Sequence, residues 1–317
     1  MLRYSLVRLV QLVVLLFVAS IVAFLVIRNS PGDPARSRLG LEATPQQIAV
    51  ERHRLGLDQS PFKQYVVWIS DAVHLDFGNS FSNGLPVTQV LSDALYYTTR
   101  LTVLATLIAL VIGAVLGLVA ALNRGRRIDV VISALASGGF SVPSFALGTL
   151  LILILSVKLG WLPSAGAGDV GQSPRQALSY LILPAITLAI PFAVVLIRFI
   201  RVAVGEAMAQ DYIVTARAKG LTRSTVLLQH GVRNAMIPTV TVAGIQVGQL
   251  LAGAVVTETV FSYPGLGRLT IQSIQGLDYP VVQAALLLEA AIFLTVTFIV
   301  DLAYGLIDPR VRLGGQK

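Results

Sequence analysis

Six long apolar runs recur along the chain and restrict what it can fold into. They cover residues 9–27, 99–122, 129–157, 178–200, 238–257 and 281–306. Each run is long enough, at about 20 residues, for a helix to cross a hydrocarbon core of about 30 Å. Only 13% of the residues are charged, against about 25% in soluble domains. We therefore predict an all-α polytopic membrane protein with six transmembrane helices.

The positions of Lys and Arg predict the orientation, because cytoplasmic loops carry the excess of these residues. The cations on one side of the predicted spans are Arg3, Arg8, Arg124, Arg126, Arg127, Arg198, Arg201, Arg217, Lys219, Arg223, Arg233, Arg310, Arg312 and Lys317. The opposite short loops hold only Lys158, Arg175 and Arg268. Both termini are therefore predicted to be cytoplasmic. The net charge of +8 follows this distribution and does not indicate nucleic-acid binding.

The spacing of the runs predicts three parts. Residues 1–28 hold the N-terminus and the first helix, residues 29–97 form an extracytoplasmic insertion, and residues 98–317 form a five-helix core. The insertion is long enough to fold as a small subdomain. It contains three turn-like sequences, PGDP at 31–34, LGLD at 55–58 and LDFGNS at 75–80. We interpret them as turns that hold the insertion together, with direct substrate contact as the alternative.

A polar, basic loop at residues 201–237 joins two of the predicted spans. Gly220 divides it, and a left-handed glycine there would end a first short helix. Thr222 is positioned to cap a second short helix through Val226. Pro238 would then lie in the first turn of the next span. Two short helices bent at a glycine favour docking onto another protein over chemistry.

The residues of this loop carry a resemblance to a known family. The sequences TARAKGL at 215–221 and HGVRNAMIP at 230–238, with GWLP at 160–163 and DLAYGLIDPR at 301–310, resemble permeases of binding-protein-dependent ABC importers. The similarity is to the dipeptide, oligopeptide and nickel class, and to the subunit with the long first loop. Of the wider family's Glu-Ala-Ala-x-x-x-Gly pattern, Ala216 and Gly220 match, while Val214 and Thr215 replace the first two residues.

The resemblance implies a type I permease fold and a transport function. The family's loop inserts into a cleft on an ATPase subunit. The coupling residues implied here are Tyr212, Thr215, Ala216, Lys219, Gly220 and Asn234. Implied partners are a second homologous permease, two ATPase subunits that bind ATP and Mg²⁺, and an extracytoplasmic solute-binding protein. The implied cargo is a peptide or a related small solute, and the implied location is the cytoplasmic membrane of a prokaryote.

The sequence lacks the motifs of an enzyme. There is no cysteine, which excludes disulfides and thiolate chemistry. No Walker A sequence is present, so ATP would be hydrolysed by another chain. The three histidines are far apart, which argues against a metal site, and no cofactor is expected on this chain. A G-x-G-x-x-G run at 166–171 follows no predicted strand, and Ser141 has no histidine base within any span.

Polar residues inside the spans are the candidates for a translocation path. Gln246 and Gln249 share one face of the fifth span, and Glu289 lies in the sixth. Each of these three side chains has an alternative, structural role, in which it forms a hydrogen bond to a neighbouring helix. Glu289 also supports a rival hypothesis, an ion-coupled secondary transporter with this residue as its proton site. The absence of an inverted repeat and the basic loop at 201–237 favour the ABC importer.

Overall fold

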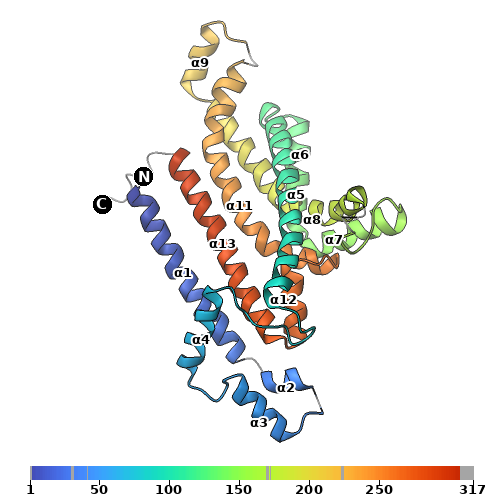
Figure 1. Cartoon of the computed structure of the whole chain (residues 1–317). Coiled ribbons are helices and arrows are strands. Elements are labelled where there is room, and N and C mark those ends of the chain that lie inside the picture. The colour runs from blue at the N-terminus through green and yellow to red at the C-terminus, as the bar shows by residue number, and fades with distance from the viewer. Residues whose placement is uncertain are drawn as a thin grey trace. The chain divides into compact units, whose positions relative to one another are not determined.

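The computed structural model describes residues 2–29, 32–40, 42–168, 171, 173–222 and 225–307. Within these ranges the chain is helical, with an isolated bridge between Asn79 and Pro86 and no strand. The helices, shown in Figure 1, are α1 (Leu2–Arg28), α2 (Pro34–Leu39), α3 (Pro45–Arg54), α4 (Pro61–Val73), α5 (Val87–Leu122), α6 (Arg127–Ser141), α7 (Ser144–Leu151), the π-helix η1 (Ile152–Lys158), α8 (Pro174–Met208), α9 (Asp211–Ala218), the π-helix η2 (Val226–Val232), α11 (Arg233–Val260), α12 (Leu266–Gln275) and α13 (Tyr279–Ile307).

The prediction of an all-α polytopic membrane protein is confirmed. Among the described residues, α1, α5, α8, α11 and α13 are each long and apolar enough to cross a membrane. The third predicted span, at 129–157, is not one helix, because α6 and α7–η1 meet at a bend of more than 40°. Val142 precedes Pro143 and takes an extended conformation with ψ 122°. A residue before proline is disfavoured in the helical region, which accounts for the break.

Two helix starts differ from the sequence prediction. α5 begins at Val87, inside the predicted insertion, because Val87, Leu91 and Ala94 recur at helical spacing and are buried together. The predicted short helix after Thr222 does not end before the next span, since η2 runs directly into α11 at Arg233. Pro238 therefore lies inside a continuous helix and not in its first turn.

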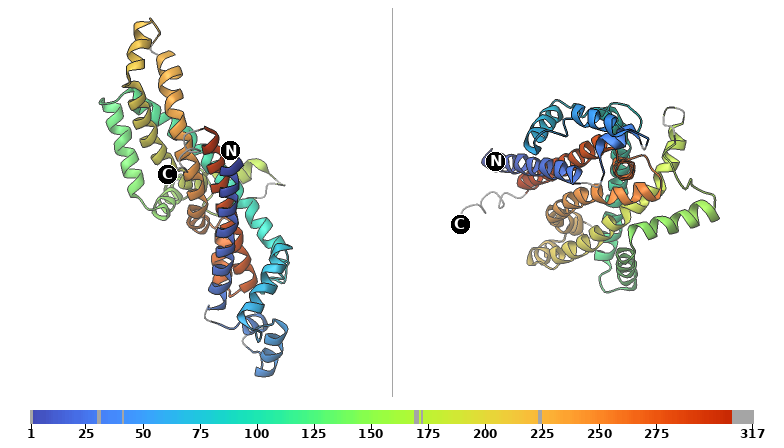
Figure 2. Two further views of the ribbon diagram at one scale, coloured as in Figure 1. Left: turned by 90° about the vertical axis from the view of Figure 1, so that its left-hand side faces the viewer. Right: turned by 90° about the horizontal axis from the view of Figure 1, so that it is seen from below.

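The helices group into two compact units. Unit 1 contains residues 1–5, 99–263 and 296–317, and unit 2 contains residues 6–98 and 264–295. Figure 2 gives two further views of the chain.

Unit 1 is built around α8, which packs against α6, α7 and α11. Pro174 follows the capping Ser173, whose hydroxyl accepts from the Gln176 N–H at 3.3 Å, and this sets the start of α8. α5 approaches α8 closely at two glycines. A Cβ at Gly113 would lie 2.6 Å from the Leu196 Cβ, and one at Gly117 would lie 2.9 Å from the Ile200 Cβ.

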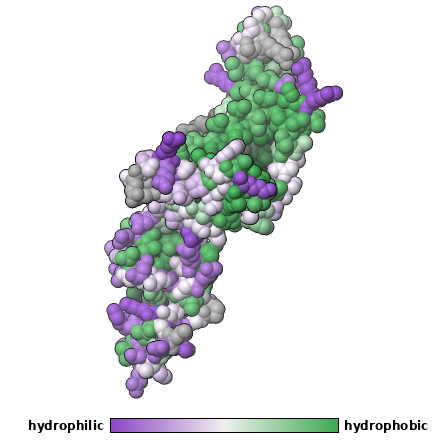
Figure 3. Space-filling view, turned by 90° about the vertical axis from the view of Figure 1, so that its right-hand side faces the viewer, coloured by the Kyte–Doolittle hydropathy of each residue, from purple (hydrophilic) through white to green (hydrophobic). Residues whose placement is uncertain are grey.

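The outward surface of unit 1 is apolar, as expected for a surface that faces lipid. Figure 3 shows a broad patch of hydrophobic residues on this face of the molecule. Exposed apolar side chains of α5 and α6 include Val103, Leu107, Val111, Val130 and Leu135. Large exposed apolar area of this kind is unusual for soluble proteins, so the surface agrees with a membrane location.

Unit 2 has its own core, formed by α5, α12 and α13. Its buried residues are Val87, Leu91, Ala94, Leu266, Val281, Ala284 and Ala285. The amphipathic helix α12 supplies Leu266, in a segment where the sequence predicts a loop between the fifth and sixth spans. The Leu266 N–H donates to the Thr98 hydroxyl at 2.7 Å, which fixes the start of α12 on α5.

Candidate functional site

The predicted loop at 201–237 is shorter in the structure, because residues 201–208 continue α8 and residues 233–237 begin α11. Between them α9 and η2 form a hairpin, described over residues 211–222 and 225–232 and here called the α9–η2 hairpin. Gly220 has a φ of 81°, so the predicted left-handed glycine is confirmed. The Leu221 N–H donates to the Ala216 carbonyl, which closes α9 in the manner of a Schellman motif. The Thr225 N–H donates to the Thr222 hydroxyl at 3.3 Å, so Thr222 caps the second helix as predicted.

The α9–η2 hairpin has a hydrophobic core of its own. Ile213, Ala216 and Val226 are buried together, and Met208 from the end of α8 packs against them. Gly231 allows this approach, because a Cβ there would lie 2.7 Å from the Met208 sulfur. The hairpin is thus attached to α8 by packing and to α11 by a continuous helix. Ala216, expected from its motif at the coupling surface, lies inside this core.

The outer surface of the hairpin combines apolar and polar groups. Val214 is 67% exposed and Leu228 is 59% exposed. Thr215, Lys219 and Gly220 are exposed as well. Figure 1 and the left view of Figure 2 place α9 beyond the ends of α5 and α6, at one end of unit 1. Exposed valine and leucine side chains on a projecting hairpin are typical of a protein docking surface.

Two of the predicted coupling residues contact each other. The Asn234 side-chain amide donates to the Tyr212 hydroxyl at 3.0 Å, which joins α9 to the start of α11. The rings of Tyr212 and His230 lie 6.4 Å apart, centroid to centroid. These contacts give Tyr212 and Asn234 a role in holding the hairpin closed.

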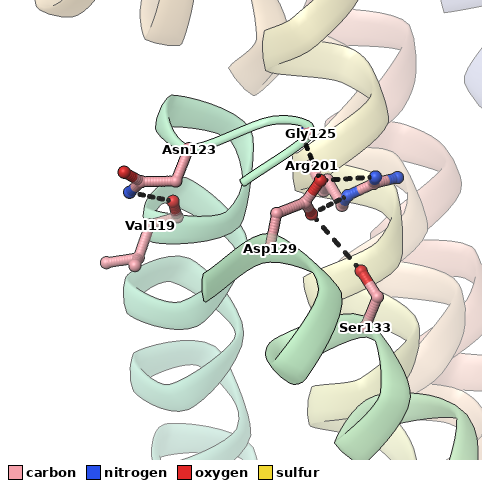
Figure 4. A network of polar contacts seen from close by, with 6 residues as sticks. All are labelled: Val119, Asn123, Gly125, Asp129, Ser133 and Arg201. Atoms are coloured by element: carbon pink, nitrogen blue, oxygen red, sulfur yellow. Dashed lines mark hydrogen bonds and ion pairs between the residues drawn. The ribbon is translucent and has the colours of Figure 1, made fainter. Parts of the chain in front are cut away.

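Sequence reasoning missed an ion pair between α6 and α8, in which Asp129 is buried and Arg201 is partly exposed. Asp129, at the start of α6, accepts two hydrogen bonds from the Arg201 guanidinium of α8, one of them at 2.8 Å. It also accepts from the Gly125 N–H at 2.9 Å and from the Ser133 hydroxyl (Figure 4). The Asp129 side chain is 2% exposed. The sequence held one sign of this contact, because Asp129 is a carboxylate at the start of a predicted apolar span and would need a partner there.

The pair fixes the α5–α6 turn to the helix that leads into the hairpin. Arg124 in this turn lies across Gly205 of α8, where a Cβ would be 2.7 Å from the guanidinium nitrogen. Gly125 has a φ of 79°, which the tight turn requires. The two contacts hold the last turns of α8, and with them Met208, against α5 and α6.

The predicted path residues are distributed over both units. Gln246 is half-buried and Gln249 exposed on α11 in unit 1, whereas Glu289 lies on α13 in unit 2. Glu289 accepts a hydrogen bond from the Thr270 hydroxyl of α12 at 2.9 Å. Gly244 of α11 packs against α13 within unit 1, since a Cβ there would lie 2.5 Å from Val300. The three polar side chains therefore belong to separate units, with Gln246 and Gln249 in unit 1 and Glu289 in unit 2.

A second buried carboxylate, also missed, organises unit 2. Asp278, which precedes α13, accepts from the Ser80 hydroxyl at 2.5 Å. It also accepts from the backbone N–H groups of Phe81 at 3.0 Å and Ser82 at 3.2 Å. These bonds tie the LDFGNS motif to the start of α13. Among the described residues, no group of three or more His, Cys, Asp or Glu side chains is placed to hold a metal ion.

Two family models match this chain. Residues 113–313 match the family described as binding-protein-dependent transport system inner membrane component. Residues 1–102 match the N-terminal family of the same transport-system membrane components. The chain belongs to the binding-protein-dependent transport system inner membrane component family. It is a multi-pass inner-membrane permease subunit of an ABC importer.

Individual relatives agree with this family. The glutathione transport system permease protein GsiC of Escherichia coli strain K12 is 42% identical over 312 residues, covering 98% of this chain and 99% of the relative. GsiC of Shigella dysenteriae serotype 1 matches to the same extent. A chain of the methionine ABC transporter MetNI, in an inward-facing conformation, has a TM-score of 0.58 at 20% identity, covering 69% of this chain and 97% of that chain. That likeness concerns the fold alone.

The family membership also bears on the rival hypothesis. The chain belongs to a family of ABC importer permeases, which disfavours the ion-coupled secondary transporter. The hydrogen bond from Thr270 to Glu289 joins α12 and α13.

Proposed function

We propose that this permease imports short peptides or peptide-like solutes. The support comes from its relatives, because GsiC is described as part of a glutathione transport system, and glutathione is itself a tripeptide. The solute would reach the permease on an extracytoplasmic binding protein. A second, homologous permease subunit and two ATPase subunits would complete the transporter, with ATP and Mg²⁺ bound by the ATPases.

The α9–η2 hairpin is proposed as the element that docks into the ATPase. The observation that carries this proposal is the hairpin's own core of Ile213, Ala216 and Val226. Because of this core, the hairpin can move as a unit without unfolding when a partner displaces it. Val214 and Leu228 supply exposed apolar contacts. The ATPase side of the membrane is the cytoplasm. Both termini would lie on that side and the insertion at 29–97 on the other.

The packing suggests how movement of the hairpin is passed to the membrane helices. Met208 belongs both to α8 and to the hairpin core, and η2 is continuous with α11. A displacement of the hairpin by the ATPase would therefore act on α8 and α11 together. Asp129 and Arg201 would carry the same displacement to α6. Gln246 and Gln249 of α11, with Glu289 of α13, remain the proposed polar lining of the path.

A substitution on the outer surface of the hairpin tests the docking role. Val214→Arg should reduce ATPase copurification and abolish substrate-stimulated hydrolysis in reconstituted vesicles. Val50→Arg on α3 is the matched control, because Val50 is 70% exposed and Val214 is 67% exposed. The control variant should assemble and hydrolyse ATP like the unmodified transporter. Normal copurification of ATPase with Val214→Arg would contradict the docking role.

A further inference from the structure

A cavity of about 690 Å³ opens in unit 2, among the helices of the insertion. It is bounded by α4, by the turn after α3 and by the loop before α5. The cavity brings together two of the motifs with no assigned function, since Gly56 and Leu57 of LGLD and Phe77 and Gly78 of LDFGNS all line it. Ligand sites for small molecules have volumes of about 300–1,000 Å³, so the cavity is large enough for a short peptide.

One face of α4 forms a wall of the cavity. Lys63, Val67 and Asp71 line it at four-residue spacing, and Gln64 and Trp68 line it beside them. Lys63 is in the first turn of α4 and Asp71 is in its last turn. At a rise of about 1.5 Å per residue, the two charged residues are about 12 Å apart along the helix. The wall thus carries a cation at one end, a carboxylate at the other and an aromatic ring between them.

Two further cations of the lining are arginines, and the Arg38 guanidinium lies 5.6 Å from the centroid of the Phe81 ring. Arg38 and Arg54 line this cavity as well. They share one carboxylate, Glu51, with nitrogen–oxygen distances of 2.9 Å and 3.7 Å. Nearby Asp58 is engaged by His53, and that hydrogen bond is the main cause of the lowered pKa of Asp58.

The end near Asp71 is anionic. Asp76 lines the cavity beside Asp71, and its carboxylate accepts from the Gly78 N–H at 3.0 Å. Phe77 and Phe81 contribute apolar surface. At the other end of α4 the helix supplies Lys63, while Arg38 and Arg54 share the carboxylate of Glu51. The α4 wall of the cavity is therefore dipolar, with Lys63 at one end and Asp71 and Asp76 at the other.

The α4 wall is held in place before any ligand binds. The Tyr65 and Ser20 hydroxyls lie 2.7 Å apart, and Arg28 of α1 donates to the Gln64 side chain at 2.9 Å. The ring of Phe24 packs edge-on against Tyr65 at 5.5 Å between centroids. A fixed wall favours binding because less conformational freedom is lost when the ligand arrives.

We propose that this cavity binds a zwitterionic peptide of about three residues, extended along α4. The peptide carboxylate would face Lys63, and its ammonium group would face Asp71 and Asp76. An extended chain spans about 3.3–3.6 Å per residue, so a tripeptide of about 10 Å matches the separation of the charges. The proposal rests on the proposed function only for the choice of peptides over other zwitterions of this length. The site would lie outside the membrane path and receive solute on the binding-protein side.

The test measures binding of trialanine to the assembled transporter in nanodiscs, without ATP and without binding protein, by calorimetry. Trialanine is expected to bind, and dialanine, which is too short to reach both ends, is expected to bind about ten-fold more weakly. N-acetyl-trialanine and trialanine amide should each bind with about ten-fold lower affinity than trialanine, which is the effect of losing one charged hydrogen bond. Import of trialanine is measured separately in vesicles, so that failure of binding and failure of peptide import are distinguishable.

Two variants assign the ends of the peptide. In Lys63→Gln, amidation of the peptide should not lower its affinity further, while N-acetylation should still lower the affinity about ten-fold. In Asp71→Asn the pattern should be reversed, as expected for contacting partners. Arg36→Gln is the matched control, since Arg36 is exposed on α2 and does not line the cavity.

Three results would overturn the proposal. The first is equal binding of trialanine and its doubly blocked form. The second is an effect of blocking that is the same in all variants. The third is no trialanine binding together with weaker docking of the binding protein to Lys63→Gln, which would assign the cavity to a protein contact. Circular dichroism and ATPase copurification check that each variant is folded and assembled.

Discussion

Arg201 of α8 donates two hydrogen bonds to the buried carboxylate of Asp129 on α6. The pair joins residues that are distant in sequence and lies close to the end of α8 that packs into the α9–η2 hairpin. The Asp129 carboxylate is 2% exposed and the Arg201 side chain is 31% exposed, so a charged Asp129 depends on this partner. The contact therefore clamps α6 to α8.

Removal of one partner should destabilise the permease. Asp129→Ala leaves the Arg201 guanidinium, the Gly125 N–H and the Ser133 hydroxyl without their acceptor. The expected cost is about 1–3 kcal/mol, measured as a lower thermal unfolding temperature of the purified permease in detergent. Asp93→Asn on the exposed surface of α5 is the control and should leave the unfolding temperature unchanged. An unchanged melting curve for Asp129→Ala would mean that the pair is not a clamp.

Gly220 should tolerate asparagine but not valine. Its φ is 81°, and an added Cβ would meet nothing within 4 Å, so the cost of substitution is backbone strain and not a clash. A left-handed β-branched residue costs about 1–2 kcal/mol, whereas asparagine adopts this conformation readily. Gly220→Val is expected to lower ATPase copurification and substrate-stimulated hydrolysis, and Gly220→Asn is expected to retain both. Equal behaviour of the two variants would show that the left-handed turn has no part in coupling.

Alanine is expected to have opposite effects on stability at two glycines, one where α5 approaches α8 and one on the open side of α6. At Gly113 the new methyl group would lie 2.6 Å from the Leu196 Cβ, so overpacking should cost about 1–3 kcal/mol. At Gly138 of α6 the methyl group meets nothing within 4 Å. Alanine there should stabilise the helix by about 0.5–1 kcal/mol. Thermal unfolding of the two variants checks both signs, and a stabilising Gly113→Ala would refute this packing.

Glu289 should be replaceable by glutamine. The Gln side chain keeps an oxygen that can accept from the Thr270 hydroxyl. Glu289→Gln is therefore expected to import solute at nearly the normal rate, while Glu289→Leu loses the bond and about 0.6 kcal/mol. A double-mutant cycle with Thr270→Val measures the coupling between the two residues. Loss of uptake in Glu289→Gln, with normal assembly, would instead indicate that the charge or proton of this carboxyl is used in transport.

Local rules predicted much of the fold from the sequence. Hydropathy located the membrane helices, and the turn chemistry of Gly220 and Thr222 predicted both ends of the bend in the hairpin. Proline was less informative. Pro184 and Pro191 remain inside α8, whereas Pro143 follows a break. Sequence alone does not distinguish these cases, because a proline is tolerated in a membrane helix when its neighbours satisfy the freed backbone groups.

Long-range pairing accounts for what the sequence did not predict. Asp129 with Arg201, and Asp278 with Ser80, join residues that no local pattern connects. Ala216 was expected at the coupling surface from its motif, but it is buried within the hairpin. A motif identifies which residue types occur together, and packing decides which of them faces outward.

The core of unit 2 has a consequence for biosynthesis. Val87 and Leu91 of α5 are buried against Val281 and Ala284 of α13, near the end of the chain. At a translation rate of about 5–20 residues per second, α5 would be made about 10–40 s before these partners. A nascent chain must therefore remain in the membrane with this face of α5 uncovered, which makes it a substrate for chaperones or proteases during that interval. Chains that stop before α12 are expected to be degraded rather than to accumulate as partial permeases.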